Sequence, residues 1–66
     1  MGGRDYTMES VIRDFRGELP AQCATAKAID AHASWDTIAM QAVADGYIEA
    51  ADRFKDLVEA VLRRAV

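Results

Sequence analysis

The stretch that decides the fold is DGYIEAADRFKDLVEAVLRRA, residues 45–65. Its apolar side chains recur every three or four residues, which places them on one face of a helix: Tyr47, Ala50, Ala51, Phe54, Leu57, Val58, Val61, Leu62 and Ala65. We therefore predict a helix at about 47–65. A tight turn should precede this helix, because Asp45-Gly46 is typical of turns. One long helix that continues through Gly46 is the alternative.

The first helix is predicted at about 8–16. Its apolar side chains share one face, since they follow the i, i+3, i+4 and i+7 spacing: Met8, Val11, Ile12 and Phe15. Thr7 is the expected N-cap, and Tyr6 should pack on Val11 as a hydrophobic staple. Gly17 should end the helix in a left-handed conformation.

Two more helices are predicted between these, at about 20–33 and 35–45. Pro20 suits the first turn of the earlier one, and small side chains on one face predict close packing: Ala21, Ala24, Ala28 and Ala31, with Cys23 nearby. Ser34 is the expected N-cap of the later helix. A single bent helix over both ranges remains an alternative.

The whole chain of 66 residues is predicted to be one all-α domain, a compact bundle of three to four short helices with tight connections. Thirteen residues are alanine and one is proline, and no stretch alternates as a strand does. Residues 1–6 are expected to be flexible.

The chain has few internal means of stabilising so small a core. A domain of this size buries only about 60% of its unfolded surface. One cysteine excludes an internal disulfide, and one cysteine with one histidine falls short of the four ligands of a structural zinc site. A partner or self-association is therefore the expected source of added stability.

Charge and composition narrow the classes of partner. The net charge is −3, which disfavours duplex DNA and anionic membranes. The N-terminus lacks the apolar run of a signal peptide, and no run approaches the length that spans a bilayer. With a single cysteine, these features predict a cytoplasmic protein without membrane attachment.

No constellation of residues predicts catalysis, a cofactor or a metal. A nucleophilic Cys23 would need a base, and the only histidine, His32, would fall on roughly the opposite face of one helix. His32 and Asp36 could form a relay, but no nucleophile accompanies them. The carboxylates at 45, 49, 52, 56 and 59 form an acidic ridge that lacks the spacing of a calcium loop.

Two stretches of the sequence resemble known motifs, but both resemblances are weak. Residues 41–46 match the core of a helix-turn-helix loosely, but acidic residues on the following helix would face phosphate. Trp35 to Phe54 resembles one tetratricopeptide-type hairpin, with small residues at Ala39 and Ala51. That resemblance covers less than half of the chain, and one repeat is not a stable domain. We interpret the stretch as a generic helical hairpin.

The sequence therefore predicts a small non-enzymatic protein-binding module, such as a regulator, adaptor or inhibitor, that docks through a helical face. The predicted interface lies on the last helix: Tyr47, Glu49, Asp52, Phe54, Asp56, Val58, Val61 and Leu62. Arg13 and Arg16 are candidate basic contacts. The alternatives are a homo-oligomeric structural subunit and, third, a nucleic-acid-associated factor.

Overall fold

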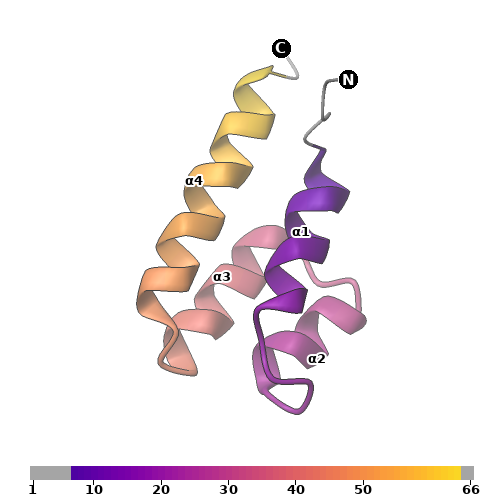
Figure 1. Ribbon diagram of the computed structural model, residues 1–66, viewed down its shortest axis with the longest axis vertical. Helices are drawn as coiled ribbons and strands as arrows, with labels where there is room; N and C mark the ends of the chain where they lie inside the picture. Colours follow the sequence, from indigo (N-terminus) through magenta and orange to yellow (C-terminus); the bar gives the residue numbers. More distant parts are fainter. Residues whose placement is uncertain (1–6, 65–66) are drawn as a thin grey trace.

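Four α-helices and no strand make up residues 7–64, the part of the chain described by the computed structural model (Figure 1). They are α1 (Met8–Gly17), α2 (Ala24–Asp30), α3 (Trp35–Ala44) and α4 (Ile48–Arg64). α1 and α4 run antiparallel along the long axis, and α2 and α3 cross beneath them. The principal extents are 34 × 20 × 20 Å. The all-α bundle predicted from the sequence is confirmed.

The start of α1 is confirmed by a reciprocal cap. The hydroxyl of Thr7 accepts a hydrogen bond from the Ser10 N–H at 3.1 Å, and the Thr7 N–H donates to the Ser10 hydroxyl at 3.0 Å. The predicted staple at Tyr6 lies outside the described residues. The predicted left-handed Gly17 is wrong, because α1 continues through Gly17 and ends at Glu18 with right-handed backbone.

α2 is shorter than predicted, because Pro20 belongs to a turn instead of the helix. The Cys23 N–H donates to the Pro20 carbonyl at 3.2 Å, and Cys23 becomes the N-cap of α2. The turn lets buried Leu19 reach the core before the chain reverses. The predicted packing face is also wrong: the small-residue stripe is not the buried side of α2, whose buried residues are Thr25 and Ala26.

The ends of α2 and α3 share one geometry. At each end, two backbone N–H groups that follow the helix donate hydrogen bonds to carbonyls of its last turn, as in a Schellman motif. Gly46 takes the left-handed position after α3, with φ 96°, which confirms the predicted turn. His32 takes the same position after α2, with φ 63°, and this separates α2 from α3. Ser34 is the N-cap residue of α3 as predicted, although its side chain makes no capping bond.

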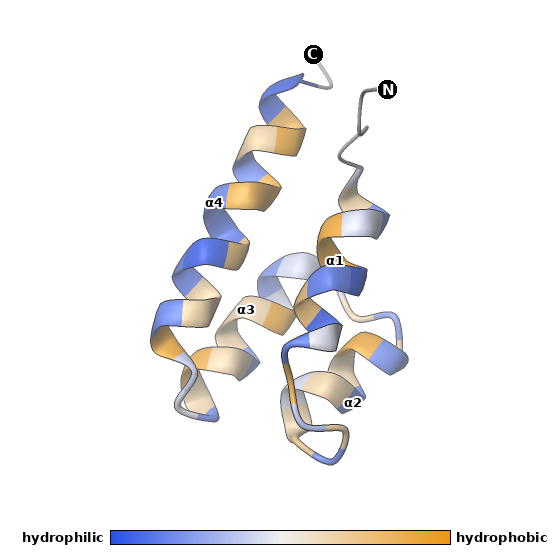
Figure 2. Cartoon of the chain, in the orientation of Figure 1, coloured by the Kyte–Doolittle hydropathy of each residue, from blue (hydrophilic) through white to orange (hydrophobic). Residues whose placement is uncertain are grey.

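The core lies where α1, α3 and α4 meet. The rings of Phe15 and Phe54 stack there, with centroids 4.4 Å apart and planes 15° from parallel. On α4, hydrophobic residues face α1 and hydrophilic ones line the opposite edge (Figure 2). The other buried apolar residues are Val11, Leu19, Ala26, Ile38, Ala39, Ala42, Ala51 and Val58.

Among residues 7–64, Thr25 is the one polar residue that is fully buried, and its side chain connects α2 to the end of α3. The Thr25 hydroxyl and N–H both donate to one carboxylate oxygen of Asp45, at 2.7 and 2.9 Å. The Gln41 amide donates to the other oxygen at 3.2 Å. These bonds, led by the one from the Thr25 hydroxyl, lower the pKa of Asp45. Asp45 therefore belongs to a contact between helices and is not part of the acidic ridge.

Candidate functional site

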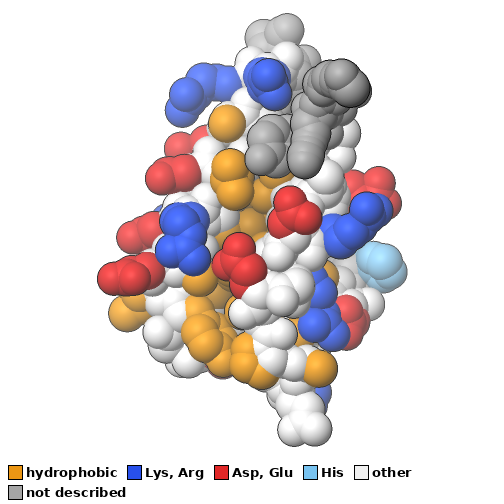
Figure 3. All heavy atoms as spheres, viewed as in Figure 1, with side chains coloured by type: hydrophobic (Ala, Val, Ile, Leu, Met, Phe, Trp, Pro, Cys, Tyr) orange, Lys and Arg blue, Asp and Glu red, His pale blue; other side chains and the backbone are white. Residues whose placement is uncertain are grey.

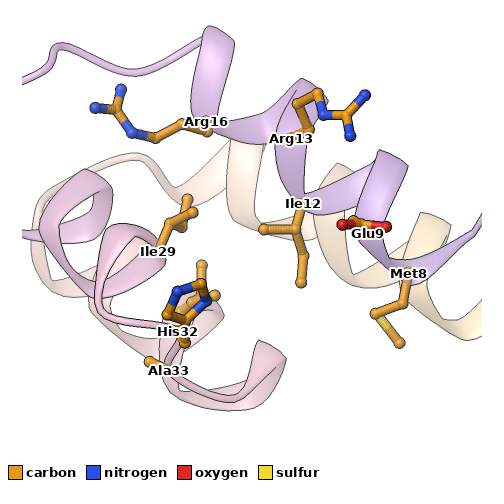
Figure 4. A pocket seen from close by; sticks show the side chains of 9 residues that line it. Met8, Glu9, Ile12, Arg13, Arg16, Ile29, His32 and Ala33 are labelled. Atoms are coloured by element: carbon orange, nitrogen blue, oxygen red, sulfur yellow. The ribbon is translucent and has the colours of Figure 1, made fainter.

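An open groove of about 570 Å³ lies between α1 and the end of α2 (Figure 4). Five of the residues that line it are apolar, and they come from α1, α2, the loop after α2, and α3: Met8, Ile12, Ile29, Ala33 and Ile38. Ile38 is buried, whereas Ile12 and Ile29 are half-buried. The groove therefore has an apolar floor that the fold covers only in part.

An ion pair joins the two walls of this groove. The Arg16 guanidinium donates to both carboxylate oxygens of Asp30, at 3.1 and 3.2 Å. This hydrogen bonding raises the pKa of Arg16 and lowers the pKa of Asp30. Arg16 lies in the last turn of α1 and Asp30 ends α2, so the pair connects the ends of the two helices at the surface. The sequence did not reveal this pair.

The rim of the groove carries charges of both signs, from Glu9, Arg13 and the Arg16–Asp30 pair. Arg13 is exposed and has no ion-pair partner among residues 7–64. His32 lies across from α1, beside Ile29, and Glu9 lies one helical turn before Arg13 (Figure 4). In Figure 3 the histidine stands on the edge of the molecule away from α4. Both predicted basic contacts thus border the groove, and of the two only Arg13 has no ion-pair partner among residues 7–64.

In the structure, the residues of the predicted interface on α4 fall into three groups, which are buried, half-buried and exposed. Phe54 and Val58 are core residues, so neither is available as a surface contact. Tyr47 and Val61 are half-buried against the core, and Leu62 is exposed. The acidic members Glu49, Asp52 and Asp56 are all exposed. Figure 3 shows acidic side chains along the edge of the molecule on the side of α4. α4 therefore uses the centre of its apolar stripe internally.

A second apolar surface lies on α3 and the start of α4, and sequence reasoning missed it. Met40 is 71% exposed and Ile48 57% exposed, with Val43 also exposed. Met40 and Val43 line a hollow of about 190 Å³ together with Trp35 and Lys55. The spacing of Met40 and Val43, three apart on one helix, was the available signal.

Two side chains that the sequence analysis considered for catalysis, Cys23 and Asp36, accept hydrogen bonds from residues close to them in the chain. The Cys23 sulfur accepts a hydrogen bond from the Ala26 N–H at 3.3 Å. Asp36 accepts bonds from the Ser34 hydroxyl at 2.6 Å and from the Thr37 N–H at 3.0 Å, and these bonds lower the pKa of Asp36. Within residues 7–64, no three His, Cys, Asp or Glu side chains are grouped as metal ligands would be.

No protein-family model, curated protein or solved structure matches the chain. The α3–α4 hairpin, which the sequence likened to one tetratricopeptide-type unit, accordingly has no family match. None of the helices in the described part of the chain has the length and hydropathy that crossing a membrane requires.

Proposed function

We propose that this protein is a small non-enzymatic protein-binding module and that the groove between α1 and α2 is its docking site. The observation that carries the proposal is the apolar floor of the groove, left open to solvent in a volume of about 570 Å³. Partly covered apolar surface that is rimmed by charged residues is typical of interaction sites. The single cysteine favours a reducing compartment, so we place the module in the cytoplasm.

The small size of the domain supports the same proposal. A chain of 66 residues buries a modest fraction of its apolar surface, so covering Ile12 and Ile29 with a partner adds stability that the isolated domain lacks. Burial contributes about 25 cal/mol for each Å² of apolar surface. Binding and folding are therefore expected to reinforce one another.

The groove replaces the last helix as the main proposed interface. The sequence placed the predicted interface on the last helix, which is α4. Phe54 and Val58 are used by the core, which leaves on that helix the exposed apolar residues Ile48, Leu57 and Leu62 and the acidic ridge (Glu49, Asp52, Asp56 and Glu59). Single exposed apolar side chains beside solvated carboxylates form a weaker docking surface than an open apolar floor.

Photo-crosslinking in living cells of the source organism tests the proposal. A photoreactive benzoylphenylalanine replaces Glu9, at the groove, in one variant and Glu59, on the outer face of α4, in a matched control. Both glutamates are exposed, so neither replacement should disturb the fold. We expect a discrete covalent adduct from position 9, weakened by Ile12→Ala. Adducts from position 59 alone, or none from either position, would contradict docking at the groove.

Self-association is the second candidate, and it rests on the exposed apolar side chains of α3 and α4. Met40 and Ile48 would both be covered in a homo-oligomer joined through this surface. Multi-angle light scattering measures the mass in solution. A dimer that Met40→Glu converts to monomer would support this candidate, and a monomer at all concentrations would exclude it.

A further inference from the structure

We infer that residues 20–33, which are α2 and the residues that flank it, unfold locally as one unit while α1, α3 and α4 stay packed. These residues are called the α2 segment below. Their opening removes one wall of the groove, so the groove alternates between a closed and an open form. The inference goes beyond the proposed function, because it does not depend on what binds in the groove.

The backbone hydrogen bonds of the α2 segment begin and end inside it. Before α2, the Cys23 N–H donates to the Pro20 carbonyl, and after α2 the N–H groups of His32 and Ala33 donate to carbonyls of the helix. Within residues 7–64, no hydrogen bond between two backbone groups joins the segment to the other helices. The segment can therefore leave without breaking the backbone hydrogen bonds of α1, α3 or α4.

Side chains connect the α2 segment to the other helices by hydrogen bonds at two places. Near its start, the hydroxyl and the N–H of Thr25 donate to Asp45 at the end of α3. Near its end, Asp30 accepts from Arg16 of α1, and this pair lies at the surface. Exposed ion pairs contribute little to stability. The contact between Thr25 and Asp45 is therefore the main polar contact that holds the segment.

The α2 segment also contributes little to the apolar core. Its fully buried apolar side chain is the single methyl group of Ala26, and Ile29 is only half-buried. The large buried side chains, among them Phe15, Ile38 and Phe54, come from the other three helices. In Figure 1, α2 lies at the edge of the molecule opposite α4. Segments with few buried apolar contacts open at a lower free energy than the whole domain does.

α2 cannot persist as a helix once the segment has left the other helices. It has seven residues, and isolated helices shorter than about 12–15 residues are marginal in water. Opening therefore unfolds the segment and is not a rigid swing of α2. The amide N–H groups of residues 25–33 then exchange with solvent, which makes the opening measurable.

Opening changes the groove because its lining comes from both parts of the molecule. Ile29 and Ala33 belong to the α2 segment, whereas Met8 and Ile12 belong to α1 and Ile38 to α3 (Figure 4). The apolar residues of α1 and α3 stay in place when the segment opens, and the opposite wall is lost. A ligand that contacts both walls would bind the closed form and suppress the opening.

Native-state hydrogen exchange measures this opening, with nuclear magnetic resonance of the full chain at urea concentrations below the unfolding transition. We expect residues 25–33 to exchange through an opening that is at least tenfold more populated than the one that exposes the slowest amides of α1 and α4. The population of this opening should also depend less on urea, because less surface becomes exposed.

Two variants separate the local opening from unfolding of the whole domain. Thr25→Val removes a hydrogen bond that both processes break, so it should speed exchange about fivefold to tenfold in α2 and in α4 alike. Leu57→Ala is the matched control, because Leu57 lies beside Val11 and Phe15, among residues that stay packed when the segment opens. It should speed exchange about fivefold in α4 and leave exchange in α2 unchanged.

Several outcomes would overturn the inference. Equal opening populations and equal urea dependences in α2 and α4 would mean that the domain unfolds as one unit. Leu57→Ala that speeds exchange in α2 as much as in α4 would have the same meaning. Amides of α3 that open together with those of α2, or a lack of protection throughout the chain, would exclude a stable body of three helices. The crosslinks from position 9 judge the proposed function separately.

Discussion

Two positions of α4, three residues apart, should respond very differently to truncation. Phe54 is 1% exposed and stacks on Phe15, whereas Leu57 is 42% exposed on the flank of the same helix. The sequence placed both on one apolar stripe. Because Phe54 is buried and Leu57 is exposed, we expect Phe54→Ala to lower the free energy of unfolding more than Leu57→Ala does.

The magnitudes follow from burial. Phe54→Ala should lower the free energy of unfolding by about 3–5 kcal/mol, through lost contacts and the cavity left behind. Leu57 keeps much of its surface in water, so Leu57→Ala should cost about 1 kcal/mol. A domain of this length has a total stability of about 3–10 kcal/mol. Phe54→Ala should therefore leave the chain marginally folded, and Leu57→Ala should leave it folded.

Urea denaturation followed by far-ultraviolet circular dichroism measures both losses, with Phe54→Leu as a milder control that fills part of the cavity. Self-association would complicate the comparison, so the protein concentration is kept the same for all variants. Equal losses at 54 and 57, or a larger loss at 57, would refute the assigned rotation of α4 about its axis.

Three other perturbations test particular contacts. Thr25→Val keeps the buried shape but removes the hydroxyl bond to Asp45, so the melting temperature should fall by about 5 °C in differential scanning calorimetry; an unchanged value would argue against the bond. Because the pKa of Asp45 lies below its ordinary 3.8 in the folded chain, its contribution to stability is complete above that value and is lost as the pH falls through the folded pKa. Melting temperatures between about pH 5 and pH 3 should thus fall less steeply in Thr25→Val than in the wild type. His32→Gly relieves a left-handed conformation that costs a non-glycine residue about 1–2 kcal/mol, offset in part by the greater freedom of glycine in the unfolded chain. The melting temperature should therefore stay level or rise, and a marked fall would show that the imidazole itself stabilises the loop. Gly46→Ala meets no neighbouring atom but places an alanine at φ 96°, so it should lose about 1–2 kcal/mol in urea denaturation; no loss would mean that the turn relaxes.

The elements that the sequence predicted well are those with local causes. Periodic apolar residues and a hydroxyl at Thr7 start and orient α1, and Asp45-Gly46 separates α3 from α4. Each of these signals acts within one turn of the helix that it defines, so it can be read without knowing what packs against it.

The end of α2 shows where local signals fail. No glycine marks this boundary, and His32 takes the left-handed position that glycine usually fills. Histidine is tolerated there more readily than bulky or branched residues. The predicted start of α2 was wrong for a related reason. Proline fits both a reverse turn and the first turn of a helix, and in the structure Pro20 lies in a reverse turn that follows buried Leu19.

The candidate site was only half predictable. Arg13 and Arg16 were identified from their spacing, but their roles differ, because Arg16 meets Asp30 across fourteen residues of chain. The groove itself could not be predicted, since its walls come from helices whose relative placement depends on packing. The same packing decided that Phe54 belongs to the core and Met40 to the surface.

By itself, the sequence determined an all-α chain of three to four helices, favoured a turn at Gly46 and predicted a long, amphipathic last helix. Hydrogen bonds between neighbouring residues and the periodicity of apolar side chains are sufficient for that. The tertiary structure alone decided which apolar residues are covered, which charges are paired and where a groove stays open. Those properties depend on residues distant in the chain, such as Thr25 with Asp45 and Phe15 with Phe54, that meet only when the helices pack.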